Sequence, residues 1–167
     1  MKEFLQQAYA LKHLDRAGWL RVGIEHPESV AAHSWGLALL CLSLAPKELQ
    51  KDKILTMALI HDLPEVETGD ITPHDGIAKT EKHKREDIAA QQLFPPALYA
   101  IWKECQEKLT PESQFIHVMD KLDMAIQAKQ YNHLADTDEF VNSALPTLNN
   151  EQLDPILSRQ IKDLLTL

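Results

Sequence analysis

An imidazole and a carboxylate stand side by side at the end of an apolar run in ALIHDLPEVETGD, residues 58–70. His61 and Asp62 end the run, and three more acids follow within eight residues. Because the run is apolar nearly all round, both side chains are expected inside the protein or at the floor of a cleft. A buried carboxylate without a partner is costly, so Asp62 needs a cation or several hydrogen-bond donors. The alternatives, that Asp62 caps a neighbouring helix or pairs with an arginine, remain open.

Two further side chains of the same kinds lie on or beside apolar helix faces. His33 shares the apolar face of its predicted helix, and Asp120 flanks the apolar stripe of residues 115–126. Each alone is more often structural, as a hydrogen-bonded core histidine or an acid at the edge of a helix face. Together with His61 and Asp62 they form a mixed nitrogen and oxygen donor set, which suits Mn, Fe, Co, Ni or Zn. Such a set leaves room on the ion for a phosphate oxygen and for a water that the ion activates.

Hydrophobic period and chain breakers predict the helices that must position these residues. Ser29 is the expected N-cap of the helix that carries His33. The predicted helices span residues 2–14, 29–45, 47–62, 80–93, 97–108, 111–134 and 151–166. The segment 136–150 is ambiguous. With five glycines and no alternating β-branched pattern, residues 1–167 are expected to form one all-α domain, a bundle of about six to eight helices.

Composition limits the classes of partner. The 167 residues carry a formal net charge of −8 and no basic stripe, which argues against binding to a nucleic-acid polymer. No stretch approaches the roughly 18 apolar residues of a membrane span, and the N-terminus lacks the pattern of a signal peptide. Cys41 and Cys105 belong to no CxxC pair and are expected to be free, buried thiols. A cytoplasmic location is therefore expected.

The order His33, His61-Asp62, Asp120 resembles the H…HD…D signature of the HD-domain metal-dependent phosphohydrolases. Local matches narrow the resemblance to the HD-domain 5′-deoxynucleotidases: PESVAAHSW (27–35), ALIHDLPEVETGDITP (58–73), KTEKHKRE (79–86) and VMDKLDMAIQA (118–128). The resemblance covers about residues 8–134 of a single HD domain, and residues 135–167 are interpreted as a C-terminal helical extension. It implies a homodimer that hydrolyses deoxynucleoside 5′-monophosphates with one divalent metal, whose identity among Co, Mn, Fe, Ni, Zn and Mg is left open.

The resemblance also implies roles for individual residues. Glu65 corresponds to a general acid or base near the metal, and Asp70 to a second acid that lines the substrate site. Arg16 corresponds to an arginine that contacts the phosphate, and Trp19 lies in the segment that lines the sugar pocket. The metal ligands correspond to His33, His61, Asp62 and Asp120.

Several structural alternatives stay open. Arg16 could form a surface ion pair with Asp15 or Glu25, Asp70 could serve only its turn, and Trp19 could be a core residue. Trp35 is expected in the core, and KHKRE at 82–86 is expected to be a solvated face from which His83 or Lys79 could reach a phosphate. The face of Leu98, Ile101 and Trp102 is a candidate dimer contact.

Two departures separate the sequence from related patterns. Ala32 stands where the family often has an acid just before the first histidine, so a partner for that histidine is missing. Alarmone hydrolases show HDxxED, whereas Val66 occupies the second acidic position here, which argues against that substrate. Another phosphorylated nucleotide such as a triphosphate, or a non-catalytic metal- or nucleotide-binding module, remains an alternative function.

Overall fold

The structure, a computed structural model of the chain, describes residues 2–150 and 153–166. Within those residues it contains helices and no β-strand, so the all-α prediction is confirmed. In chain order the elements are α1 (Lys2–Ala10), the 3-10 turn η1 (Leu11–His13), α2 (Ala17–Arg21), α3 (Val30–Leu44), α4 (Lys51–Ile60), α5 (Glu65–Thr68), α6 (Lys79–Leu93), α7 (Pro96–Glu107), α8 (Pro111–Tyr131), α9 (Asp138–Leu148) and α10 (Pro155–Leu165).

Eight of the described helices have nine or more residues, in agreement with the predicted range. The largest differences from the prediction lie at the ends of the chain. The first predicted helix stops at Ala10 and continues as η1, and the ambiguous segment 136–150 contains α9. The last helix starts at Pro155, where the Asp154 side chain caps it, and residues 151–152 of its predicted range lie outside the described residues.

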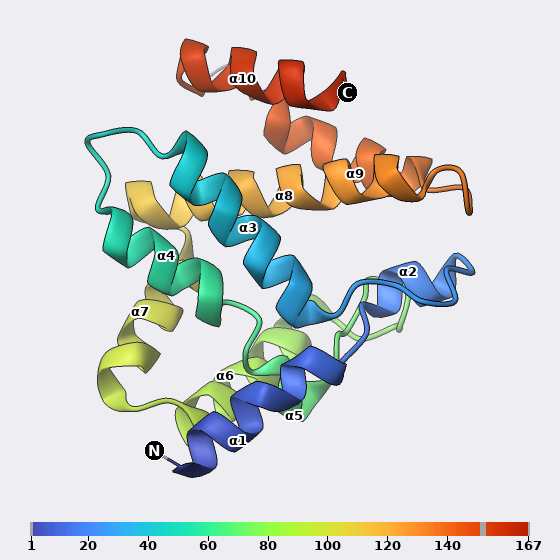
Figure 1. Cartoon of the computed structure of the whole chain (residues 1–167). Helices are drawn as coiled ribbons and strands as arrows, with labels where there is room; N and C mark the ends of the chain where they lie inside the picture. The colour runs from blue at the N-terminus through green and yellow to red at the C-terminus, as the bar shows by residue number, and fades with distance from the viewer. Residues whose placement is uncertain (1, 151–152, 167) are drawn as a thin grey trace.

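Helix α8 is the central element of the fold. It packs against α3, α4, α7, α9 and α10, and Figure 1 shows α3 crossing it while α9 and α10 lie beyond it. Met119 and Leu122 of α8 are fully buried against Leu37 of α3 and Met57 of α4. Burial of each such side chain stabilises the fold by about 1.5–3 kcal/mol. The two helices that carry His33 and His61-Asp62 are therefore fixed against the helix that carries Asp120.

A second apolar cluster holds α1, α6 and α7 together at the other end of the molecule. Trp102 of α7 is only 2% exposed there, and Leu98 and Ile101 pack on the same cluster. The predicted dimer contact on this face is therefore wrong, because its central residue is buried within the chain. No helix of the described residues is long and apolar enough to cross a membrane.

The expectation that Trp35 belongs to the core is also wrong, since its side chain is 67% exposed. Position 35 lies two residues, or about 200°, around α3 from the buried His33 and thus faces away from α8. The two cysteines are buried and free as predicted, and burial raises the pKa of each thiol to about 12.

Candidate active site

His33 enters the site from the buried face of α3. Ser29 caps this helix by accepting a hydrogen bond from the Ala32 amide at 3.2 Å, as predicted. The His33 side chain is fully buried, and its Nδ1 lies 2.7 Å from Oδ2 of Asp123 on α8. A carboxylate in this position holds the imidazole proton on Nδ1, which leaves the lone pair on Nε2 free to bind a ligand.

His61 and Asp62 leave α4 at its C-terminal end. Nδ1 of His61 lies 3.0 Å from the carbonyl oxygen of Ala58, and because a carbonyl only accepts, Nδ1 donates and Nε2 carries the lone pair. The carbonyl of His61 in turn accepts from the Trp102 indole at 2.9 Å and from the Gln106 amide at 3.3 Å. Helix α7 therefore fixes the end of α4, and with it the direction of the His61 ring.

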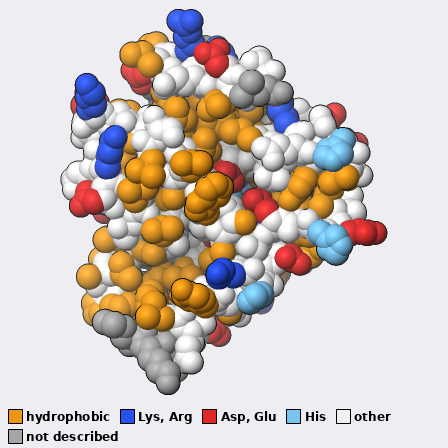
Figure 2. Space-filling model, in the orientation of Figure 1, with side chains coloured by type: hydrophobic (Ala, Val, Ile, Leu, Met, Phe, Trp, Pro, Cys, Tyr) orange, Lys and Arg blue, Asp and Glu red, His pale blue; other side chains and the backbone are white. Residues whose placement is uncertain are grey.

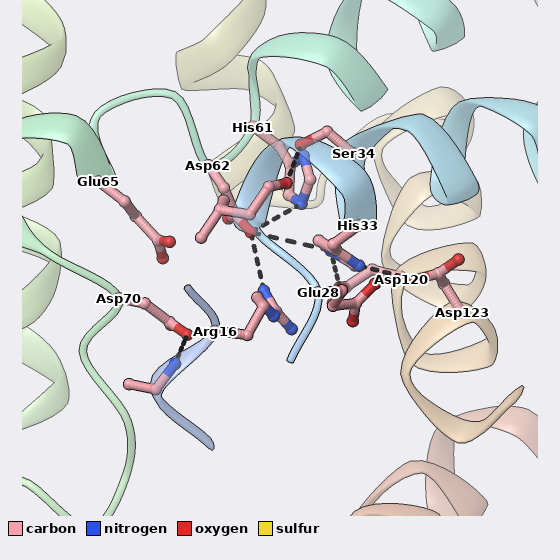
Figure 3. Close-up of polar contacts among 12 residues, drawn as sticks. Arg16, Glu28, His33, Ser34, His61, Asp62, Glu65, Asp70, Asp120 and Asp123 are labelled. Carbon is pink, nitrogen blue, oxygen red and sulfur yellow. Dashed lines mark hydrogen bonds and ion pairs between the residues drawn. The ribbon is translucent and has the colours of Figure 1, made fainter. Parts of the chain in front are cut away.

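The four predicted metal ligands lie together (Figure 3). Oδ2 of Asp62 is 3.1 Å from Nε2 of His61 and 3.8 Å from Nε2 of His33. Nε2 of His33 is 3.2 Å from Oδ1 of Asp120. Ligand atoms of His33, His61 and Asp62 all lie within 4.8 Å of one another, so this group could hold a metal ion.

The donor atoms of this cluster fit a cation. Nε2 of His33 and Nε2 of His61 are buried and have no hydrogen-bond partner of acceptable geometry, despite the short distances to the carboxylates. Burial lowers the pKa of His33, but the carboxylates of Asp120 and Asp123 outweigh it and raise the pKa to about 9. Burial alone would raise the pKa of Asp62, yet the neighbouring histidines and Arg16 lower it. The centre of the cluster thus favours a positive charge, as a divalent transition metal would supply.

Arg16 reaches the cluster through a short antiparallel contact between two loops. Its amide donates to the Glu28 carbonyl at 3.1 Å, which fixes the arginine beside the start of α3. Its guanidinium lies 3.3 Å from Oδ2 of Asp62, not against Asp15 or Glu25. Asp70 accepts from the Ala17 amide at 2.8 Å, so it anchors the segment that carries Arg16 and does more than serve its turn.

Glu65 begins α5 and is only 3% exposed. Burial, and then the charges of Asp62 and Asp70, raise the pKa of Glu65 well above its ordinary value. Its Oε2 has no hydrogen-bond partner, and its carboxyl points into the space in front of Asp62 and Arg16 (Figure 3). A buried carboxyl whose pKa is raised in this way is suited to proton transfer.

The stretch KHKRE at 82–86 is only partly the solvated face that was predicted. Arg85 is exposed, but Lys82 donates to the Ile71 carbonyl at 2.8 Å and lies 3.9 Å from Oε1 of Glu65. Glu86 is buried and lies 3.4 Å from Lys82. Helical spacing puts residues 82 and 86 on one face, which α6 turns toward the acidic site.

A cavity of about 400 Å³ opens in front of the cluster. Its walls include Arg16, Trp19, Glu65, Asp70 and Phe140. Trp19 is 1% exposed and packs on Phe140 of α9 at a centroid distance of 4.1 Å, so it is both a core residue and part of the cavity wall. Phe140 comes from the segment left ambiguous by the sequence, where no periodic signal marked it.

Asp123 and Gly36 are contributors that the sequence motifs did not assign. A Cβ at Gly36 would lie 2.4 Å from Oδ1 of Asp123, so the glycine makes room for the carboxylate that holds His33. Asp123 thereby supplies the partner that Ala32 cannot. Its spacing of three residues after Asp120 on α8 was the only signal available in the sequence.

The described residues form an all-α bundle in which two histidines and two aspartates meet in the chain order H…HD…D. This combination of fold and residues is typical of HD-domain proteins. The chain belongs to the HD-domain family, whose model matches residues 8–159. This match extends past residue 134 into α9 and α10.

Individual relatives agree with this membership. The Xenopus laevis protein named 5′-deoxynucleotidase HDDC2 is 32% identical over 93% of this chain and 83% of its own length. A crystal structure from Pyrococcus horikoshii OT3 is similar with a TM-score of 0.88 at 33% identity, covering 99% of both chains. A cyanophage S-2L HD phosphohydrolase solved with dA and one catalytic Zn²⁺ shares the fold, with a TM-score of 0.70 at 19% identity over 96% of this chain and 93% of its own.

Proposed function

We propose that the chain is a phosphomonoesterase that hydrolyses deoxynucleoside 5′-monophosphates to deoxynucleoside and phosphate with one divalent metal ion. The observation that carries the proposal is the convergence of His33, His61, Asp62 and Asp120 beside a cavity that also contains a buried acid and an arginine. The similarity to proteins named 5′-deoxynucleotidase, over more than nine-tenths of this chain, supports the substrate class.

The proposed metal ligands are Nε2 of His33 and His61 and the carboxylates of Asp62 and Asp120. When bound there, a divalent ion supplies positive charge for the phosphoryl oxygens and lowers the pKa of a water. A catalytic role for this ion would require that the four protein ligands leave room on it for a water and a phosphate oxygen, unlike a structural metal site.

The chain's own residues supply the other requirements of phosphate ester hydrolysis. Arg16 offers a planar pair of donors that neutralises the phosphate and fixes its orientation. Glu65, whose pKa is raised by burial and by neighbouring acids, is the group we assign to proton transfer with the leaving 5′-oxygen. Trp19 and Phe140 form an apolar wall for the nucleoside, and Asp70 keeps the Arg16 segment in place.

The test is phosphate release from dAMP, dGMP, dCMP, dTMP and dUMP beside AMP and GMP. The protein is stripped with a chelator and then given Co, Mn, Mg or Zn. Release that requires metal and favours the deoxynucleotides is the expected result. Metal-loaded protein that releases no phosphate from any of them contradicts the proposal and favours another phosphorylated nucleotide or a binding role.

Asp123→Asn is expected to weaken metal binding by about 10–100-fold, because the amide oxygen can still accept from His33 Nδ1 but the carboxylate charge that makes this ligand histidine more basic is lost. Gly36→Ala should weaken it similarly, since the new Cβ displaces the Asp123 carboxylate, although alanine favours helix by about 1 kcal/mol. Metal affinity is measured by calorimetry. Asp52→Asn, on the exposed side of α4, is the matched control. Normal metal affinity in both Gly36→Ala and Asp123→Asn would refute the role of Asp123 in positioning His33.

We also propose that the enzyme is a cytoplasmic homodimer, as the family resemblance implies. Trp35, Leu39 and Leu42 form an exposed stripe at helical spacing on α3, with exposed fractions of 67%, 49% and 51%. Figure 2 shows hydrophobic side chains gathered on the face that carries α3. Light scattering should give twice the 19.0 kDa chain mass, and Trp35→Asp should give the monomer. A monomeric wild type would contradict the proposal.

A further inference from the structure

Two cavities meet at the ligand cluster. The larger one contains Arg16 and the aromatic wall, and a smaller one of about 200 Å³ is lined by His61, Lys108 and His117. Both share Asp62, Lys82 and Asp120 in their walls. The cluster is therefore accessible from two differently lined sides, one with aromatic rings and one with cationic or proton-donating side chains.

Lys108 in the smaller cavity has an unusual backbone conformation. It is the C-cap of α7 with φ of 55°, and it is the only non-glycine residue with positive φ within residues 2–150 and 153–166. Glycine or asparagine usually occupies such a position because other side chains strain the backbone. The fold therefore does not explain a lysine here, and a strained residue beside a site points to a role for its side chain.

The ammonium of Lys108 has no carboxylate partner within an ion-pair distance among the described residues. It lies 3.1 Å from Nδ1 of His117. An ammonium only donates, so Nδ1 of His117 accepts and its proton is on Nε2. Burial, and then Lys108, lower the pKa of His117, in agreement with a neutral ring. Lys108 is exposed and keeps two N–H groups beyond the one that bonds to His117, and the half-buried His117 carries a further N–H at Nε2. Both side chains line the smaller cavity beside the ligand cluster, where these donors are available to an anion.

We propose that the smaller cavity binds inorganic phosphate, the second product, through Lys108 and His117. The inference rests on the proposed function for the identity of the anion. In hydrolysis the water oxygen bonds to phosphorus as the bond to the 5′-oxygen breaks. One water proton stays on the phosphate, and the other replaces the proton that Glu65 gives to the leaving 5′-oxygen. Because attacking and leaving oxygens lie roughly in line, the nucleoside lies against the aromatic wall of the larger cavity and the attacking water comes from the opposite side. The phosphate lies between the two cavities, held by Arg16 from one side and reached by Lys108 and His117 from the other.

The acidic walls of the cavity make this binding conditional. Asp62 and Asp120 repel an anion unless a cation is bound between them, whereas Lys82 lies 3.4 Å from Glu86 and offsets its charge. Phosphate should therefore bind the metal-loaded protein and bind the stripped protein at least about tenfold more weakly. Anions are thus kept out of the smaller cavity until the metal ion is bound.

The test is calorimetric titration of inorganic phosphate into protein loaded with stoichiometric Co²⁺, together with phosphate inhibition of deoxynucleoside release followed by chromatography. Lys108→Asn should weaken phosphate binding by about tenfold or more, as expected for a lost charged hydrogen bond. Asparagine tolerates the backbone conformation, so the melting temperature should not fall. His117→Phe should also weaken binding, and His117→Gln, which keeps an N–H donor, should retain most of it.

Lys103→Asn is the matched control, because Lys103 pairs with Asp87 on the surface and lines neither cavity. Phosphate affinity that is unchanged in both Lys108→Asn and His117→Phe overturns the site, as does a Co²⁺-loaded wild type that binds no phosphate at millimolar concentration. Phosphate binding that depends on Lys108 in a protein without nucleotidase activity supports the site and contradicts the proposed function. Nucleotidase activity whose inhibition by phosphate is unaltered in Lys108→Asn and His117→Phe supports the proposed function and contradicts the phosphate site.

Discussion

His61→Ala is expected to abolish metal binding and phosphomonoesterase activity together. The variant loses one of two imidazole donors whose Nε2 atoms face the cluster without a hydrogen-bond partner. Loss of the ion removes several kcal/mol of charge stabilisation, so turnover should fall by about 10³-fold or more. Asp120→Ala should behave in the same way, since Asp120 is the carboxylate nearest to His33 Nε2 at 3.2 Å.

The measurement combines metal content after dialysis with phosphate release from dAMP. His133→Ala, at an exposed position after α8, is the matched control and should keep both properties. Either ligand variant that retains metal and normal turnover would remove that residue from the assigned ligand set. Retained metal with lost turnover would indicate that the residue contacts substrate instead.

Glu65→Gln is expected to keep the metal and lose about 10²–10⁴-fold in turnover, the usual contribution of a proton-transfer group. Glutamine has the same shape and no exchangeable carboxyl proton. Glu67→Gln, on the exposed side of the same short helix, is the matched control. A near-normal rate for Glu65→Gln would exclude Glu65 from the chemistry.

The same substitution should stabilise the metal-free protein above about pH 4.5. Burial raises the folded-state pKa of Glu65, so the folded chain binds the proton more tightly than the unfolded chain. Stability is then lost as the pH rises from the unfolded pKa toward the folded one, and glutamine avoids this loss. A pKa difference of one is worth about 1.4 kcal/mol, so urea melts of both proteins between pH 4 and 8 measure it. If the unfolding free energies of the two proteins change with pH in parallel, the pKa of Glu65 is the same in the folded and the unfolded chain.

The clustering of the four proposed ligands could be predicted because each of them lies in, or directly after, a helix with a clear apolar pattern. His33 shares the buried face of α3, and His61 and Asp62 end a helix with a continuous apolar pattern. Helical period fixes the direction of such side chains, and the motif order identifies their partners.

The walls of the site could not be predicted in the same way. The Arg16 segment is held by backbone hydrogen bonds to residues 28–30, which leave no mark on side-chain pattern. Phe140 reaches the cavity from a helix with Pro146 in its interior, which obscured the helical signal. The prediction that Trp35 is buried failed because it relied on the aromatic side chain, whereas the position of residue 35 around the axis of α3 decides its exposure. The close approach of Asp123 to Gly36 depends on how α3 and α8 cross.

The ion pair between Arg16 and Asp62 would make the proposed metal and the phosphate ester linked ligands. The guanidinium lies 3.3 Å from a carboxylate of the metal cluster, so one cation serves two anions in turn. If Asp62 bound the proposed metal ion, Arg16 would be released for the phosphate, and a phosphate that engaged Arg16 would leave Asp62 available to the metal. Because thermodynamic coupling is reciprocal, each ligand changes the affinity of the other by the same factor.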